Sequence, residues 1–151
     1  MARFEFRLQS YLNLKTKLED QKKQAYGRAL AELEEARRKK TAMERERRGL
    51  LAALKENIAR RVDPSDIRRY NDYIDLLKKR ILRQQQTVKL LEDAAELRRL
   101  ELVTAMQERK MLDTLKENQL EQFTREQAIL EQKTVDEIVS YQYSDRSEVT
   151  P

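Results

Sequence analysis

The stretch IRRYNDYIDLLKKRILRQQQTVKLLEDAAELRRLELVTAMQERKML, residues 67–112, decides the fold. Its apolar side chains recur at steps of three and four residues, the heptad pattern of a long α-helix that packs against a partner helix. Polar residues at seam positions either set the register or extend out of the groove to solvent. The apolar seam consists of Ile67, Tyr70, Ile74, Leu77, Ile81, Val88, Leu91, Ala95, Leu102, Ala105 and Leu112, and its polar interruptions are Gln84, Arg98 and Arg109.

A break precedes this helix at Val62-Asp63-Pro64-Ser65-Asp66. Asp63 is suited to cap the helix, Pro64 to occupy its first position, and Asp66 to meet the positive end of its dipole. We therefore expect a first helix over about 4–61, a turn over 62–65, a second helix over about 65–139 and a flexible tail over 140–151.

The segment before the break is also helical in character, but its apolar stripe is weaker. Gly27 and Gly49 lie within it, and each costs about 1 kcal/mol relative to Ala and marks a place where the helix can bend. Two long helices and one tight turn predict an all-α fold, a long antiparallel two-helix coiled-coil hairpin that forms a single domain over 1–151. The stripe comprises Leu8, Tyr11, Leu12, Leu18, Ala25, Ala29, Leu33, Ala36, Met43, Leu50, Leu54 and Ile58.

The position of the turn also predicts the register. If it centres near residues 63–64, residues whose numbers sum to about 127 face each other, and Phe4 lies near Phe123. Beyond Phe123 the second helix then has no partner within the chain, and its apolar side chains are uncovered. An uncovered apolar strip of this kind indicates a binding partner.

The composition supports a coiled coil and excludes several classes of function. Charged residues make up 39% of the chain, and Cys, His and Trp are absent, so the chain has no thiol nucleophile and no imidazole base or metal ligand. It has no glycine-rich phosphate loop. We expect no enzymatic activity, no cofactor and no metal. No secretory signal or membrane span is recognised, so we expect a soluble protein of a reducing cytoplasm.

The charge is unevenly placed. Residues 37–83 carry 16 Lys or Arg and 7 Asp or Glu, whereas the remainder carries 16 and 20. The turn half of the hairpin is therefore basic. It suits an acidic protein surface, an anionic lipid or a nucleic acid, and it is equally consistent with a solvated helix face.

Three stretches resemble the flagellar type III export protein FliJ family. They are Phe4-Glu-Phe-Arg-Leu-Gln-Ser-Tyr-Leu-Asn-Leu at the start, Tyr70-Asn-Asp-Tyr-Ile-Asp-Leu-Leu-Lys-Lys-Arg-Ile81 after the turn, and Glu131-Gln-Lys-Thr-Val-Asp-Glu-Ile138 near the end. The resemblance implies a non-enzymatic component of bacterial flagellar protein export. FliJ-like proteins are antiparallel two-helix coiled coils, similar to the central stalk of rotary ATP synthases.

The resemblance also implies partners and a location. FliJ-like proteins bind and stimulate the hexameric export ATPase. They also bind the cytoplasmic domain of the membrane export gate and export chaperones. We expect neither nucleic-acid binding nor membrane insertion, and a location at the inner face of the cell membrane. The resemblance places the ATPase contact at Phe4, Phe6, Phe123, Ile129, Leu130, Val135 and Ile138, and the gate contact at Met43, Leu50, Tyr73 and Leu77.

The first helix departs from the family pattern, because it carries Glu46 and Leu50 where family members carry aromatic residues. Leu77 also fits a core position of the seam. Two alternative functions remain: a stalk of a virulence-type secretion system or rotary ATPase, and a general coiled-coil scaffold, including one that associates with nucleic acid. A steep salt dependence of DNA binding would favour the nucleic-acid version.

Overall fold

The computed structural model describes residues 2–61 and 63–148, and two α-helices contain most of them. Helix α1 spans Gln9–Ala59 and helix α2 spans Pro64–Glu148, and the described residues include no β-strand. The predicted all-α class with two long packed helices is confirmed. The chain groups into two compact units, one of residues 18–105 and one of residues 1–17 with 106–151.

The start of α2 is built as its sequence predicts. The Asp63 carboxylate accepts a hydrogen bond from the backbone N–H of Ser65 at 3.2 Å, and Pro64 is the first helical residue. Asp66 lies in the first turn, where it meets the positive end of the helix dipole. On the other side of the turn, Arg61 adopts a left-handed backbone with φ 58°, a common way to end a helix. Val62 lies outside the described residues.

Both helices differ from their expected limits. α1 begins at Gln9 rather than near residue 4, after a turn in which the Gln9 N–H donates to the Phe6 carbonyl at 3.0 Å. α2 continues to Glu148, although residues 140–148 were expected to be flexible. This segment contains neither Gly nor Pro, and Arg146 in the last turn favours the negative end of the dipole. Residues 149–151 lie outside the described residues.

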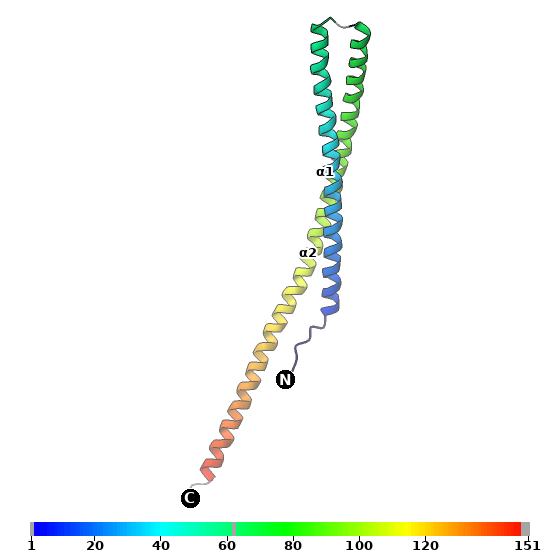
Figure 1. Cartoon of the computed structure of the whole chain (residues 1–151). Helices are drawn as coiled ribbons and strands as arrows, with labels where there is room; N and C mark the ends of the chain where they lie inside the picture. Colours follow the sequence, from blue (N-terminus) through cyan, green and yellow to red (C-terminus); the bar gives the residue numbers. More distant parts are fainter. Residues whose placement is uncertain (1, 62, 149–151) are drawn as a thin grey trace. The chain divides into compact units, whose positions relative to one another are not determined.

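Within residues 18–105, α1 and α2 run side by side in opposite directions (Figure 1). All predicted apolar seam residues of α2 are buried or half-buried, in this unit and beyond it. Small Ala side chains allow the two helices to approach closely, but each buries little apolar area. One cluster comprises Leu33, Ala36, Val88 and Ala95, with Ala29 and Leu91 packed against it.

The buried and half-buried positions of α1 follow a regular heptad, although several of them are polar residues. From Leu12 to Asn57, every residue at alternating steps of three and four is buried or half-buried. Leu8, Tyr11 and Ile58 were expected in the stripe but are exposed, so those three predictions are wrong. The seam positions are Leu12, Lys15, Glu19, Lys22, Tyr26, Ala29, Leu33, Ala36, Lys40, Met43, Arg47, Leu50, Leu54 and Asn57.

Polar residues of the α2 seam are accommodated in two ways. The Gln84 side chain donates from Nε2 to the Ala36 carbonyl at 2.9 Å, so it crosses to the α1 backbone instead of extending to solvent. Arg98 is exposed and pairs with Glu101 on its own helix, as expected for a side chain that reaches out of the groove. A polar group at a seam position specifies alignment at a cost in stability.

Contacts between the helices confirm the antiparallel register within each unit. In residues 18–105, Lys22 pairs with Glu101 at 3.2 Å and Arg37 with Glu92 at 3.1 Å. In the other unit, Lys15 pairs with Glu108 at 2.7 Å, and the rings of Phe4 and Phe123 lie 5.6 Å apart. The residue numbers of these pairs sum to values from 123 to 129, near the expected 127. Nearer the turn the register differs from the expected one, because Gln84 with Ala36 sums to 120 and Tyr73 with Glu46 to 119.

Leu77 and its neighbour Leu76 provide a matched test of this narrow core. Leu77 is only 1% exposed, whereas Leu76 is 42% exposed. We expect Leu77→Ala to lower the free energy of unfolding by about 2–5 kcal/mol because it leaves a cavity in the seam. Urea unfolding followed by circular dichroism measures the change. Leu76→Ala is the control, and an equal loss in both variants would contradict the assigned seam.

Candidate partner-binding surfaces

The end of α2 presents apolar side chains to solvent without cover. Every residue of 128–148 is exposed. The predicted contact residues Ile129, Leu130, Val135 and Ile138 are 52–56% exposed, and Val139, Tyr141 and Tyr143 add to this surface. The last two were missed because the sequence analysis placed them in a flexible tail.

These apolar residues are distributed around the helix. At about 100° per residue, Leu130, Ile138 and Tyr141 lie on one side of α2, while Ile129, Val139 and Tyr143 lie on the other. A helix that binds one flat surface has a single apolar stripe, whereas a helix enclosed by its partner is apolar on several sides. The apolar side chains at the end of α2 therefore lie on more than one side of the helix.

The three phenylalanines predicted for this site are buried or half-buried within the chain. Phe4 is half-buried and packs on Phe123 with the two rings inclined by 50°. Phe6 is only 8% exposed. The three rings attach the N-terminal segment to α2, so most of their surface is occupied within the chain. The segment of α2 in which every residue is exposed begins at residue 128, beyond Phe123.

A groove of about 530 Å³ lies between α1 and α2 near the turn. It includes two of the four predicted gate-contact residues, one on each helix. Its lining combines apolar with charged side chains. Its lining residues are Leu50, Asn57, Asp66, Arg69, Tyr70 and Tyr73.

The four residues predicted as the gate contact do not form one exposed patch. Leu50 and Tyr73 line the groove together. Met43 is half-buried in the α1 seam, and Leu77 is fully buried. Leu77 is therefore a core residue, and its place in the predicted contact is wrong. Asn57, Asp66, Arg69 and Tyr70 belong to the groove and were missed, because only the helix pairing brings them together.

Tyr73 joins the two helices at the rim of this groove. Its hydroxyl donates to the Glu46 carboxylate at 2.6 Å. This hydrogen bond, together with partial burial and the Glu46 charge, raises the pKa of Tyr73 above its ordinary value, while nearby Arg80 opposes the shift.

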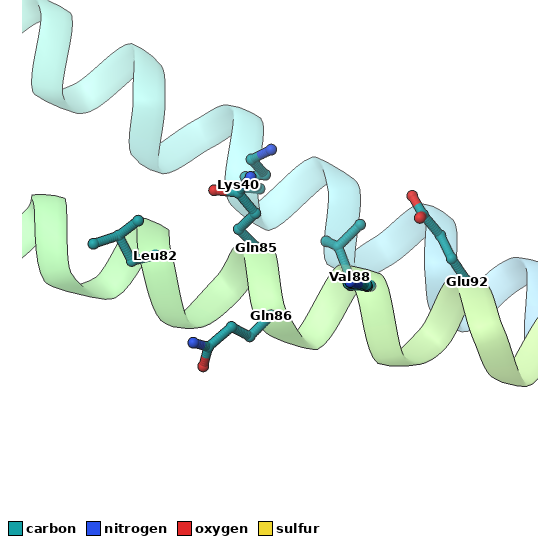
Figure 2. A pocket seen from close by; sticks show the side chains of 7 residues that line it. Lys40, Leu82, Gln85, Gln86, Val88 and Glu92 are labelled. Carbon is teal, nitrogen blue, oxygen red and sulfur yellow. The ribbon is translucent and has the colours of Figure 1, made fainter.

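A second groove of about 590 Å³ lies further along residues 18–105. Figure 2 shows Gln85 and Val88 on the side of α2 that faces α1, where Lys40 lies, whereas Gln86 points to the opposite side. The groove is shallow and is lined by side chains of both charges. Its residues are Lys40, Leu82, Gln85, Gln86, Val88, Lys89 and Glu92.

Two kinds of site are absent from the part of the chain that the structure describes. Residues 2–61 and 63–148 contain no cluster of three or more acidic side chains arranged to hold a metal ion. None of the helices over these residues has a stretch long and apolar enough to cross a bilayer.

The Tyr73–Glu46 bond predicts a measurable titration. We expect Glu46→Gln to lower the pKa of Tyr73 toward its ordinary value, because the largest cause of the shift is removed. The raised pKa favours the neutral phenol in the folded chain, so its stabilising contribution is present below about pH 10 and is lost as the phenol ionises. NMR titration of ring-labelled tyrosine measures this pKa. Glu44→Gln, which removes a partner of Lys40, is the control; a Tyr73 pKa unchanged by Glu46→Gln would contradict the bond.

Comparison with known proteins agrees with these features. The family described as "Flagellar FliJ protein" matches residues 4–148, which is nearly the whole chain. No curated protein matches the chain, and no solved structure does. The family match covers both helices, the turn between them and the exposed end of α2. This chain therefore belongs to the flagellar FliJ family, whose members are non-catalytic components of flagellar protein export.

Proposed function

We propose that this chain acts as the stalk-like cofactor of the hexameric flagellar export ATPase, inserting the end of α2 into the ATPase ring and stimulating hydrolysis. The observation that carries the proposal is the helical, fully exposed segment 128–148 with apolar side chains on several sides. A ring pore surrounds what enters it, and a segment enclosed in this way gains from apolar contacts in every direction.

We further propose that the turn half connects the ATPase to the cytoplasmic domain of the export gate. The groove near the turn supplies apolar and aromatic surface at Leu50, Tyr70 and Tyr73. It lies in the basic segment 37–83, where long-range attraction favours an acidic partner surface. Binding of export chaperones is part of the same proposal and rests on family membership alone.

Stimulation of the cognate export ATPase tests the first proposal. Burying one Leu or Ile side chain is worth about 1.5–3 kcal/mol, so Leu130→Ser with Ile138→Ser raises the concentration for half-maximal stimulation about tenfold or more. Because the proposal encloses the helix, Ile129→Ser with Tyr143→Ser on the opposite side has a comparable effect.

Leu30→Ser, at an exposed leucine of α1, is the matched control and leaves stimulation unchanged. ATP hydrolysis is measured at a series of stalk concentrations, and circular dichroism verifies the helical content of each variant. Full stimulation by a chain that lacks residues 128–151 would refute ring insertion through this end. Loss on only one side of α2 would replace enclosure with a flat contact.

Binding to the purified cytoplasmic domain of the export gate tests the second proposal. We expect Tyr73→Ser to weaken binding about tenfold, because it removes the aromatic rim of the groove, and added salt to weaken it further. Calorimetry measures the dissociation constant. Leu76→Ser, three residues away and outside the groove, is the control. Equal binding by the Tyr73 variant and the parent chain would exclude the groove as the contact.

A further inference from the structure

Helix α2 carries a second apolar stripe that α1 does not cover. Leu82, Leu90, Leu97 and Leu100 are 50–71% exposed. At about 100° per residue they fall on one face of α2, on the side opposite the seam formed by Val88, Leu91 and Ala95. Figure 2 shows Gln86 on the side of α2 that points away from α1, whereas Leu82 lies at the edge of this face, where it also lines the groove with Lys40.

The charges along this stripe are separated. Residues 78–89 carry five basic side chains and no acidic one, whereas residues 92–101 carry four acidic and two basic side chains. In the part of the chain that the structure describes, Arg83 and Lys89 form no ion pair. The stripe therefore has a basic half with uncompensated charges followed by an acidic half.

A surface with this charge pattern is complementary to itself in the antiparallel direction. When a second copy is turned around, its acidic half lies over the basic half of the first copy. Because the pair is two-fold symmetric, the acidic half of the first copy also lies over the basic half of the second. An unrelated acidic partner would match only one half of the stripe, and an anionic membrane would be repelled by the other. Self-complementarity therefore favours a second copy of this chain over other occupants.

We propose that the stripe Leu82–Leu100 of α2 is a self-association surface, on which two copies of the chain pair antiparallel through their α2 helices. The inference goes beyond the proposed function and does not rest on it.

One register matches Leu82, Leu90 and Leu100 as well as the flanking charges, and it places Leu97 opposite Gln86. When residue numbers of the two copies sum to 182–185, Leu82 faces Leu100, Leu90 faces Ala94, and Arg83 faces Glu101. Lys89 then lies between Asp93 and Glu96 of the other copy. In an antiparallel helix pair, a charged residue beside the apolar stripe meets residues on the same side of the partner's stripe. The charged pairs named above fulfil this condition. Glu96 already binds Arg99, and Glu101 already binds Arg98 of its own helix and Lys22 of α1, so the second copy adds to existing charge pairs.

The expected dimer is weak. The stripe occupies about 20 residues, or about 30 Å of helix, so its interface falls below the standard size of stable complexes. We expect a dimer in the micromolar range that weakens as salt rises, since the flanking charges are exposed. Such a dimer has twice the 18.1 kDa mass of one chain.

Sedimentation equilibrium of the full chain, from about 1 to about 200 μM, tests the inference. We expect reversible dimerisation that Leu90→Glu weakens at least about tenfold. Leu14→Glu, at an exposed leucine of α1, is the control and leaves the dimer intact. Circular dichroism confirms that each variant keeps its helices. A chain that stays monomeric over the whole range at low salt overturns the proposal.

A charge exchange distinguishes this register from other dimers. Lys89→Glu in one chain, and Asp93→Lys with Glu96→Lys in another, each place like charges together in a homodimer. Both variants are therefore expected to be monomeric alone and to form a heterodimer when mixed. A dimer that persists in each variant alone, as one made by exchange of whole helices would, overturns the proposal. Failure of the mixture to associate overturns the register.

Discussion

Burial of a single heptad seam of α2 against α1 is the constraint on which the rest of this structure depends. The core is one side chain deep on each helix and relies on residues such as Leu77, Val88 and Ala95. No second layer adds apolar area, so alignment must come from elsewhere. It comes from cross-helix ion pairs, from the Gln84 bond to the α1 backbone and from the capped turn at Asp63. A narrow core also leaves most of each helix surface available to partners.

The sequence predicted the two helices unequally well. The seam of α2 was recognised because nearly all of its positions are apolar, so its spacing is visible without knowledge of the partner. In α1, six of the fourteen seam positions are Lys, Glu, Arg or Asn. An apolar residue type therefore no longer indicates which positions of α1 are buried. Exposed Leu8 and Tyr11 were chosen, while buried Glu19 was missed. Which polar residue lies in the seam depends on contacts such as Lys15 with Glu108, which no single helix specifies.

The candidate surfaces were also predicted unequally well from the sequence. The uncovered end of α2 follows from chain length and the position of the turn, both readable from the sequence, although its helical extent to Glu148 was not. Polar composition at residues 140–148 suggested flexibility, but the absence of Gly and Pro lets the helix continue. The groove near the turn could not be predicted in detail. It depends on how deeply each residue lies between the helices, and this places Tyr73 at the rim and Leu77, four residues later, in the core.

The three proposed surfaces share no residue, and this has a consequence for how the chain works. The groove uses residues between Leu50 and Tyr73, the self-association stripe uses Leu82–Leu100, and the ring contact begins at Ile129. A substitution on one surface therefore leaves the chemistry of the others intact. Moreover, each surface uses a different physical cue: an aromatic rim in a basic segment, a stripe with opposed charges, and an apolar helix end exposed on several sides. Under these proposals, a chain with almost no interior discriminates among partners through these differences in charge and side-chain distribution.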